Sequence, residues 1–176
     1  MRAAARGDRA AAERLARALL PRVRNLVRYL VRGDDEVDDI AQMALIDVLQ
    51  GVGTFRGDAP VERWADRIVA RATFRQLKRS RVRLARETLE TEPRDPAAPT
   101  DAEQRYLSRR AAARVLDRLP EAQRVAVVLH HAAGFSVPEI ADMEGVSPDT
   151  IKSRIRLGVG KLRATVGPEA AAEAAS

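Results

Sequence analysis

The acidic residues and the histidines are the side chains of this sequence that could perform catalysis or hold a metal ion. Five carboxylates crowd the segment from Asp34 to Asp39, but a metal ion needs carboxylates that converge from several directions, and neighbours at a helix start mostly face solvent. The only histidines, His130 and His131, are adjacent. Adjacent positions on a helix point about 100° apart, which disfavours a shared zinc site. We therefore expect no metal and no cofactor.

Nucleophilic and phosphate-transfer chemistry also lack their usual sequence signals. The chain has no cysteine, and it shows no nucleophile motif, no phosphate-binding loop and no metalloprotease helix. We therefore expect that the protein is not an enzyme and that it has no catalytic residues.

The charge balance favours a nucleic-acid partner. Lysine and arginine outnumber aspartate and glutamate by 31 to 25, which gives a net charge of +6 and a sequence pI of about 10.6. Such a balance suits a polyanionic partner better than a small acidic substrate. The absence of cysteine suits a reducing compartment, and no apolar run approaches the length of a membrane span. We expect a cytoplasmic protein without membrane insertion.

The stretch FSVPEIADMEGVSPDTIKSRI, which begins at Phe135, predicts two short helices joined by a tight turn. Ser136 and Glu139 have the spacing of a capping box, and Phe135 and Ile140 have that of a hydrophobic staple. Gly145 can adopt the left-handed conformation that ends a helix. These local signals predict that the first helix of the hairpin starts at Ser136.

The second helix of the hairpin has an apolar inner side and a polar outer side. Ser147 is its predicted N-cap, with Pro148 in the first turn. Its inner residues are Ile151, Ile155, Val159 and Leu162, and its outer residues include Asp149, Lys152, Ser153 and Arg156. Such a helix can enter the DNA major groove, where these polar groups reach base edges and phosphates. The alternative is a plain helical hairpin with a solvated charged surface.

A second basic region lies near the only tryptophan, Trp64. Like charges spaced four residues apart repel each other on a helix, and phosphates would relieve that repulsion. The basic residues are Arg63, Arg67, Arg71, Arg75, Lys78, Arg79 and Arg81, and the aromatic ones among them are Phe55, Trp64 and Phe74. Aromatic side chains among cations favour single-stranded DNA, because bases can stack on the rings. The alternative places Trp64 in the core and the arginines in solvent.

The segment from Asp35 to Gln50 predicts the most regular helix of the chain. Its apolar residues Val37, Ile40, Ala41, Ala44, Leu45, Val48 and Leu49 share one side. The residues on the other side are Asp39, Gln42, Met43, Ile46 and Gln50. Met43 and Ile46 among polar groups suit a docking surface for a partner helix, although isolated exposed apolar residues are also common.

The remaining pattern predicts an all-α chain of two small domains. Before the Asp35 helix, apolar residues recur at Leu15, Leu19, Val23, Leu26 and Leu30, and Pro21 is expected to start a second helix there. After it, Val61, Trp64, Ile68 and Ala72 begin a third apolar stripe that runs to about residue 80. From Glu87 to Glu103 the sequence is acidic, contains prolines and lacks a helical period, so a linker is expected. Helical periodicity resumes near Tyr106.

These surfaces, in this order, resemble the extracytoplasmic-function sigma factors of the bacterial sigma-70 family. The resemblance runs from about Gly7 to Arg163 and rests on GDRAAAERL, DDEVDDIAQMALIDVLQ, FRGDAPVERWADRI, the acidic linker, and the block from RLPEAQRVAVVLHH through the hairpin. It implies sigma region 2 in residues 1–82, a linker in 83–105 and region 4 in 106–168. The low complexity of the last residues separately predicts a disordered tail in 169–176.

The resemblance also implies three binding surfaces. The helix from Asp35 is expected to dock on the clamp of the largest subunit of core RNA polymerase through Asp35, Asp39, Gln42, Met43, Ile46 and Gln50. The melted minus-10 strand is expected to contact Phe55, Arg56, Gly57, Asp58, Trp64, Arg67, Arg71, Arg75 and Lys78, with a flipped base in the loop before Pro60. Duplex minus-35 DNA is expected to contact Ser147, Asp149, Thr150, Lys152, Ser153 and Arg156.

An anti-sigma protein is a further partner that the resemblance implies, and the acidic linker is expected to pass through a polymerase channel built for nucleic acid. Two departures from the family pattern stand out. Many members carry Trp-Leu-Tyr where this chain has Trp64, Ala65 and Asp66. Gly158 and Gly160 are expected to weaken the final turns of the last helix, so that it ends early or frays there. The rival interpretation is a stand-alone helix-turn-helix regulator, which explains the hairpin but neither the basic region nor the linker.

Overall fold

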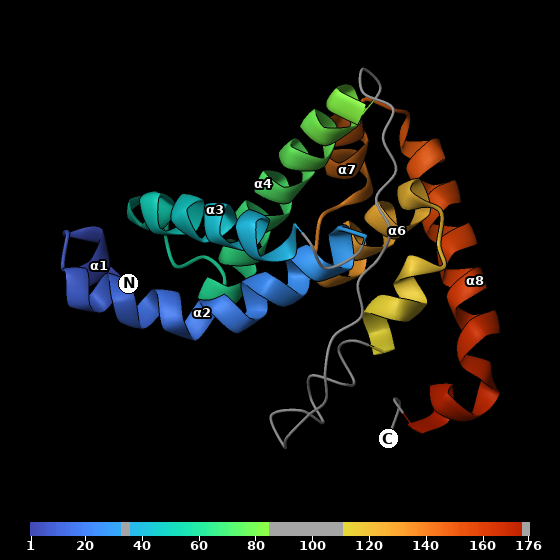
Figure 1. Ribbon diagram of the computed structural model, residues 1–176, viewed down its shortest axis with the longest axis horizontal. Coiled ribbons are helices and arrows are strands. Elements are labelled where there is room, and N and C mark those ends of the chain that lie inside the picture. Colours follow the sequence, from blue (N-terminus) through green and yellow to red (C-terminus); the bar gives the residue numbers. More distant parts are fainter. Residues whose placement is uncertain (33–35, 85–110, 174–176) are drawn as a thin grey trace. The chain divides into compact units, whose positions relative to one another are not determined.

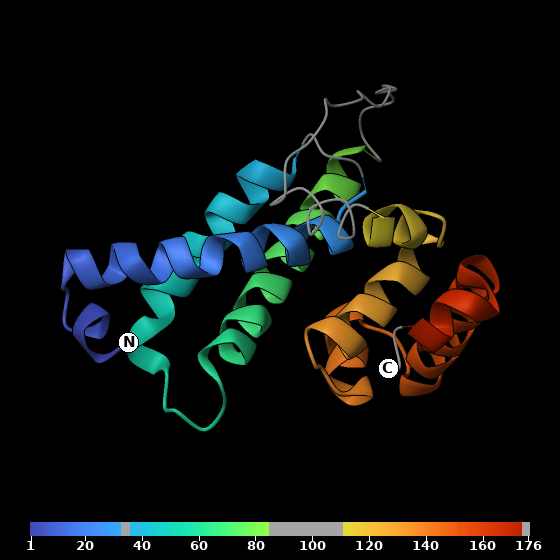
Figure 2. The ribbon, with the colours of Figure 1, turned by 90° about the horizontal axis from the view of Figure 1, so that it is seen from below.

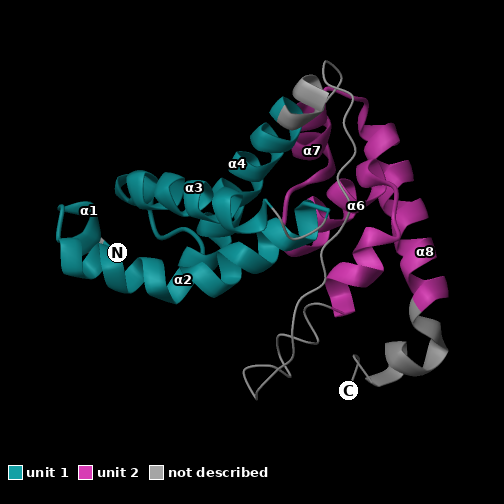
Figure 3. Ribbon diagram, in the orientation of Figure 1, with its two compact units in different colours: residues 1–96 teal, residues 97–176 magenta. Residues whose placement is uncertain are grey.

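The computed structural model describes residues 1–32, 36–84 and 111–173 of the chain, and every regular element in these ranges is a helix (Figure 1; Figure 2). The chain divides into two compact units, unit 1 from Met1 to Pro96 and unit 2 from Ala97 to Ser176 (Figure 3). The predicted all-α fold is confirmed. Most of the predicted linker and Asp35 lie outside the described residues.

Unit 1 is a bundle of three long helices. Its elements are α1 (Arg2–Ala5), α2 (Arg9–Leu30), α3 (Val37–Gln50), the 3₁₀ turn η1 (Gly51–Thr54) and α4 (Val61–Leu84). Helices α2, α3 and α4 each pack against the other two. The apolar side of α3 is buried as predicted, from Val37 through Ile40 and Ala44 to Val48. These residues belong to a core that the three helices share.

Pro21 does not divide the first long helix, contrary to the prediction. Helix α2 runs from Arg9 to Leu30 with Pro21 inside it. A proline in a helix interior removes one backbone hydrogen bond and crowds the preceding turn. Pro21 is exposed, so water can solvate the carbonyl that loses its donor. On the opposite side, Leu19, Val23 and Leu26 are buried and hold the two halves of α2 in one bundle.

The buried side of α4 differs from the predicted stripe. Val61, Trp64, Ile68 and Ala72 are only half-buried. The buried apolar residues of α4 are Ala65, Val69, Ala70, Phe74 and Leu77. The helix is therefore rotated relative to the prediction, because these residues fill its contact with α2 and α3. Phe74, predicted among the DNA-facing aromatics, belongs to the core.

Asp66 is a buried carboxylate on the inner side of α4. Its side chain is 5% exposed and accepts two hydrogen bonds from Arg22 on α2, from Nε at 2.7 Å and from Nη2 at 2.6 Å. The hydrogen bonds to Asp66 raise the pKa of Arg22. A two-pronged bond of this kind fixes geometry as well as charge. The Ala65 and Asp66 departure from the family pattern therefore points into the bundle and not toward a DNA strand.

Unit 2 contains residues 111–117, which are helical, followed by α6 (Glu121–Val127), the π-helix η2 (Val128–Ala132), α7 (Val137–Glu144) and α8 (Pro148–Glu173). Helix α8 packs against both α6 and α7. Leu129, Phe135, Ile140 and Ile151 are almost fully buried and form the centre of this unit. The hairpin therefore lies on its own small core.

Gly158 is a packing position and not a helix end, contrary to the prediction. Helix α8 continues through Glu173, and Gly158 is buried. A Cβ atom at Gly158 would lie 2.7 Å from Val127 Cγ2 and 3.4 Å from the Gln123 carbonyl oxygen. Gly158 thus lets α8 approach α6 closely. Gly160 has open space instead.

Arg124 is a fully buried cation that the sequence pattern did not reveal. It is 1% exposed, and its Nη1 lies 2.8 Å from Asp117 Oδ1. The ion pair joins α6 to the helical residues 111–117 across the turn at Pro120. It therefore fixes the direction in which the chain enters the core of unit 2.

Candidate protein and nucleic-acid interfaces

The local signals of the helix-turn-helix hairpin are all present. The Ser136 N–H donates to Glu139 Oε2 at 2.9 Å, and the Glu139 N–H donates to Ser136 Oγ at 3.4 Å, so the capping box is formed. Phe135 and Ile140 are buried at 1% and 0% exposure. Gly145 has φ +69°, the left-handed conformation that ends helix α7. The predicted hairpin is confirmed.

Two further contacts hold the hairpin in place. His130 Nδ1–H donates to the Phe135 carbonyl oxygen at 2.9 Å, which ties the end of η2 to the start of the hairpin. Arg154 of α8 forms an ion pair with Glu144 of α7, in which the Glu144 side chain is 9% exposed. Sequence reasoning missed both contacts, because each joins residues through their placement and not through a local motif. The Arg154–Glu144 pair therefore joins α8 to α7, and the His130 contact joins η2 to the hairpin.

Helix α8 presents the predicted minus-35 residues along its first three turns. Ser147 Oγ accepts a hydrogen bond from the Thr150 N–H at 3.2 Å and lies 2.9 Å from Thr150 Oγ1, so both hydroxyls belong to the N-cap. Lys152 is paired with Asp149 at 3.0 Å. Arg156 is exposed, and Ser153 is half-buried. Lys152 and Arg156, one turn apart, are the long cationic side chains of this surface.

The loop before α4 is anchored by an aromatic pair. The rings of Phe55 and Trp64 meet edge to face, with centroids 5.4 Å apart. Trp64 also packs over Gly51 at the start of η1. Arg56, Gly57 and Asp58 are exposed, and Gly57 has φ +84°. Figure 2 shows that the backbone of this loop extends beyond the helices of unit 1.

The basic residues of α4 lie on one side of the helix but differ in their surroundings. Arg71, Arg75 and Lys78 are exposed, and Arg67 is half-buried. Arg75 Nη2 donates to Asp47 Oδ2 of α3 at 2.7 Å. Lys78 Nζ lies 5.8 Å from the centre of the Phe74 ring. Asp47 therefore relieves part of the charge repulsion that was expected to be relieved by phosphates.

The predicted docking side of α3 is open to solvent. Met43 and Ile46 are each 46% exposed, and Asp39, Gln42 and Gln50 are exposed around them. Exposed apolar side chains framed by polar ones are the composition of a protein interface. The structure brings these five residues together on one helix, as predicted.

Candidate metal ligands do not gather within the described residues. No group of three or more histidine, cysteine, aspartate or glutamate side chains there has the arrangement of a metal site. His130 is engaged by the Phe135 carbonyl. Partial burial and the neighbouring His130 lower the pKa of His131.

In the same described ranges, no helix is long and apolar enough to cross a membrane.

Known families match both units. Residues 15–83 match Sigma-70 region 2, and residues 109–162 match Sigma-70, region 4. The ECF RNA polymerase sigma factor SigM of Mycobacterium tuberculosis is 35% identical over 161 residues, which cover 92% of this chain and 80% of that protein. The RNA polymerase sigma factor CarQ of Myxococcus xanthus is 29% identical over 148 residues, with 84% of each chain covered.

Solved structures share the fold. The sigma factor RpoE of Bartonella quintana, in complex with the anti-sigma factor NepR, superposes with a TM-score of 0.56 at 22% identity and covers 85% of this chain and 92% of that chain. CnrH, in complex with the cytosolic domain of CnrY, gives a TM-score of 0.52 at 24% identity, with 93% and 92% covered. Both sigma-70 regions are matched, and a relative with 35% identity aligns over 92% of this chain, so the chain belongs to the ECF RNA polymerase sigma factors.

Proposed function

We propose that the protein binds core RNA polymerase through the exposed side of α3, holds the melted minus-10 strand on α4 and its preceding loop, and reads duplex minus-35 DNA with α8. The observation that supports this division is that one chain exposes two surfaces of different chemistry. The Phe55–Trp64 pair beside the exposed arginines of α4 suits unpaired bases. The capped α8 helix suits a major groove.

The polymerase supplies all the chemistry in this proposal. The sigma factor contributes binding energy and register only, so the protein is not an enzyme, and it acts in the cytoplasm beside the polymerase. Two weak DNA sites on one chain bind together more tightly than either alone, because the first contact raises the effective concentration of the second.

An anti-sigma protein is the regulator within the same proposal. The structural neighbour RpoE is in complex with the anti-sigma factor NepR. We infer that a protein of this class covers the exposed side of α3 and thereby competes with the polymerase.

Transcription from a promoter library with sigma-free core polymerase tests the proposed function. Addition of the protein should produce promoter-specific transcripts, whereas the protein alone should bind duplex promoter DNA weakly. Tight promoter binding by the protein alone, with no transcripts from the library, would favour a stand-alone helix-turn-helix regulator instead.

Single substitutions separate the two DNA surfaces. Arg156→Ala should lower the preference for the minus-35 sequence by about 1–3 kcal/mol, the usual contribution of one base-reading side chain. Arg163→Ala, at an exposed position further along α8, is its matched control. Arg71→Ala should instead slow open-complex formation, measured by permanganate reactivity of unpaired thymines. Equal effects of Arg156→Ala and Arg163→Ala would refute the assignment of Arg156.

A further inference from the structure

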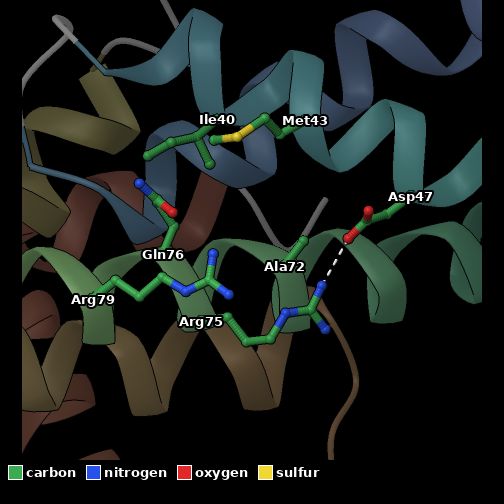
Figure 4. Close-up of a pocket in the computed structure, with 7 residues that line it drawn as sticks. All are labelled: Ile40, Met43, Asp47, Ala72, Arg75, Gln76 and Arg79. Atoms are coloured by element: carbon green, nitrogen blue, oxygen red, sulfur yellow. Dashed lines mark hydrogen bonds and ion pairs between the residues drawn. The ribbon is translucent and has the colours of Figure 1, made fainter.

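A pocket of about 270 Å³ lies between α3 and α4. Its α3 wall contains Ile40, Met43 and Asp47, and its α4 wall contains Ala72, Arg75, Gln76 and Arg79 (Figure 4). We call it the α3–α4 pocket. Met43 belongs both to this pocket and to the exposed side of α3, so the pocket is continuous with the proposed polymerase-docking surface.

The charges of the α3–α4 pocket leave room for one anionic group. Arg75 is already neutralised by Asp47, to which it donates at 2.7 Å. Arg79 is exposed, and among the side chains drawn in Figure 4 it is joined to none by a hydrogen bond or ion pair. Within the part of the chain that the structure describes, the Arg79 charge therefore has no ion-pair partner, and it lies at the rim beside the Gln76 amide.

The size and the apolar lining limit what the pocket can take. Its volume is below the range of about 300–1,000 Å³ that is usual for small-molecule sites, so it suits a side chain better than a cofactor. Ile40, Met43 and Ala72 form an apolar wall. A carboxylate on an aliphatic stem matches a cation beside such a wall, whereas a run of phosphates would require several uncompensated cations.

We propose that the α3–α4 pocket receives one acidic side chain of the polymerase segment that docks on α3, with Arg79 as its ionic partner. This inference rests on the proposed docking of α3. Arg79, which was predicted as part of the basic region near Trp64, then belongs to the polymerase interface together with Gln76. Arg75 positions the α4 wall of the pocket through its ion pair with Asp47. Specificity for the polymerase then comes from α4 as well as from α3.

The test is the dissociation constant of the full chain for its cognate core RNA polymerase in the absence of DNA. Arg79→Ala should raise the Kd about tenfold, the effect of losing one well-placed charged contact at an interface. Arg79→Lys should recover part of this loss, because it keeps the charge without the planar fork. Arg17→Ala, at an exposed position on α2, is the control for a changed net charge.

Two further variants make each outcome decisive. Ile46→Asp, on the exposed side of α3 but outside the pocket, tests the docking proposal itself. If Ile46→Asp weakens binding and Arg79→Ala does not, the pocket inference is wrong and the docking surface stands. If neither weakens binding, α3 is not the docking helix. If Arg79→Ala leaves polymerase affinity unchanged but impairs open complexes as Lys78→Ala should, the pocket takes a DNA phosphate.

Discussion

At the residue scale, the two glycines of α8 have opposite surroundings although they lie only two positions apart. Gly158→Ala would force a Cβ to within 2.7 Å of Val127 Cγ2, and Val127 is β-branched and cannot easily move. We expect a loss of about 1–3 kcal/mol in the free energy of unfolding, as in other overpacked cores. Gly160→Ala should instead add up to about 1 kcal/mol through helix propensity.

Urea unfolding of the full chain, followed by circular dichroism, measures both glycine variants. Equal effects of the two substitutions would show that propensity, and not the contact between α8 and α6, sets the stability at these positions.

The Arg124–Asp117 pair predicts a second residue-scale result. Asp117→Ala removes a carboxylate from a cation that is 1% exposed. Such a loss typically costs about 3–5 kcal/mol, because the remaining buried charge is left without that partner. The double variant Asp117→Ala/Arg124→Met should be more stable than Asp117→Ala alone. Thermal unfolding of the single and double variants checks this order, and a double variant that is less stable than the single one contradicts it.

At the element scale, Pro21 lies in the interior of α2 at an exposed position. Pro21→Ala restores the missing backbone donor, which is worth about 3 kcal/mol in a helix interior. The substitution also raises the conformational entropy of the unfolded chain, which reduces this gain in stability by about 1 kcal/mol. We therefore expect unit 1 to gain roughly 2 kcal/mol in stability. Urea unfolding followed by the fluorescence of Trp64 measures this, with Leu20→Ala as the exposed neighbouring control. An unchanged midpoint would mean that α2 has already compensated for the proline.

The sequence was most informative where an element depends on local chemistry. The capping box of Ser136 and Glu139 and the left-handed Gly145 involve residues within one or two turns, so the hairpin could be predicted in detail. The buried side of α4 could not, because Trp64 and Ile68 have an apolar spacing as regular as that of Ala65 and Val69. Only packing against α2 and α3 selects between the two sides.

The site residues also divide into those that local sequence predicts and those that depend on packing between helices. The exposure of Met43 and Ile46 followed from the helical period of α3, because the opposite side was clearly apolar. The Asp47–Arg75 pair and the α3–α4 pocket could not be predicted, since they depend on how α3 and α4 are placed against each other. The Arg22–Asp66 pair escaped prediction for the same reason, because its partners are 44 positions apart.

At the scale of the whole molecule, each unit has a core of its own. Trp64 is the only tryptophan and lies in unit 1, so its emission reports the unfolding of that unit. Ile151 is fully buried in unit 2, and Ile151→Ala should cost that unit about 2–5 kcal/mol. We expect the circular dichroism transition to shift while the Trp64 transition keeps its midpoint. A parallel shift in both signals would show that the two units unfold together.

The Arg22–Asp66 pair implies an order of events in the evolution of this chain. The Arg22 side chain is 48% exposed and tolerable without a partner, whereas the Asp66 side chain is 5% exposed and a lone buried carboxylate is strongly unfavourable. An ancestor could therefore acquire the arginine first and the aspartate second, but not the reverse. Relatives with an aspartate at this place in α4 should nearly always have the arginine, while some with the arginine should still lack the aspartate.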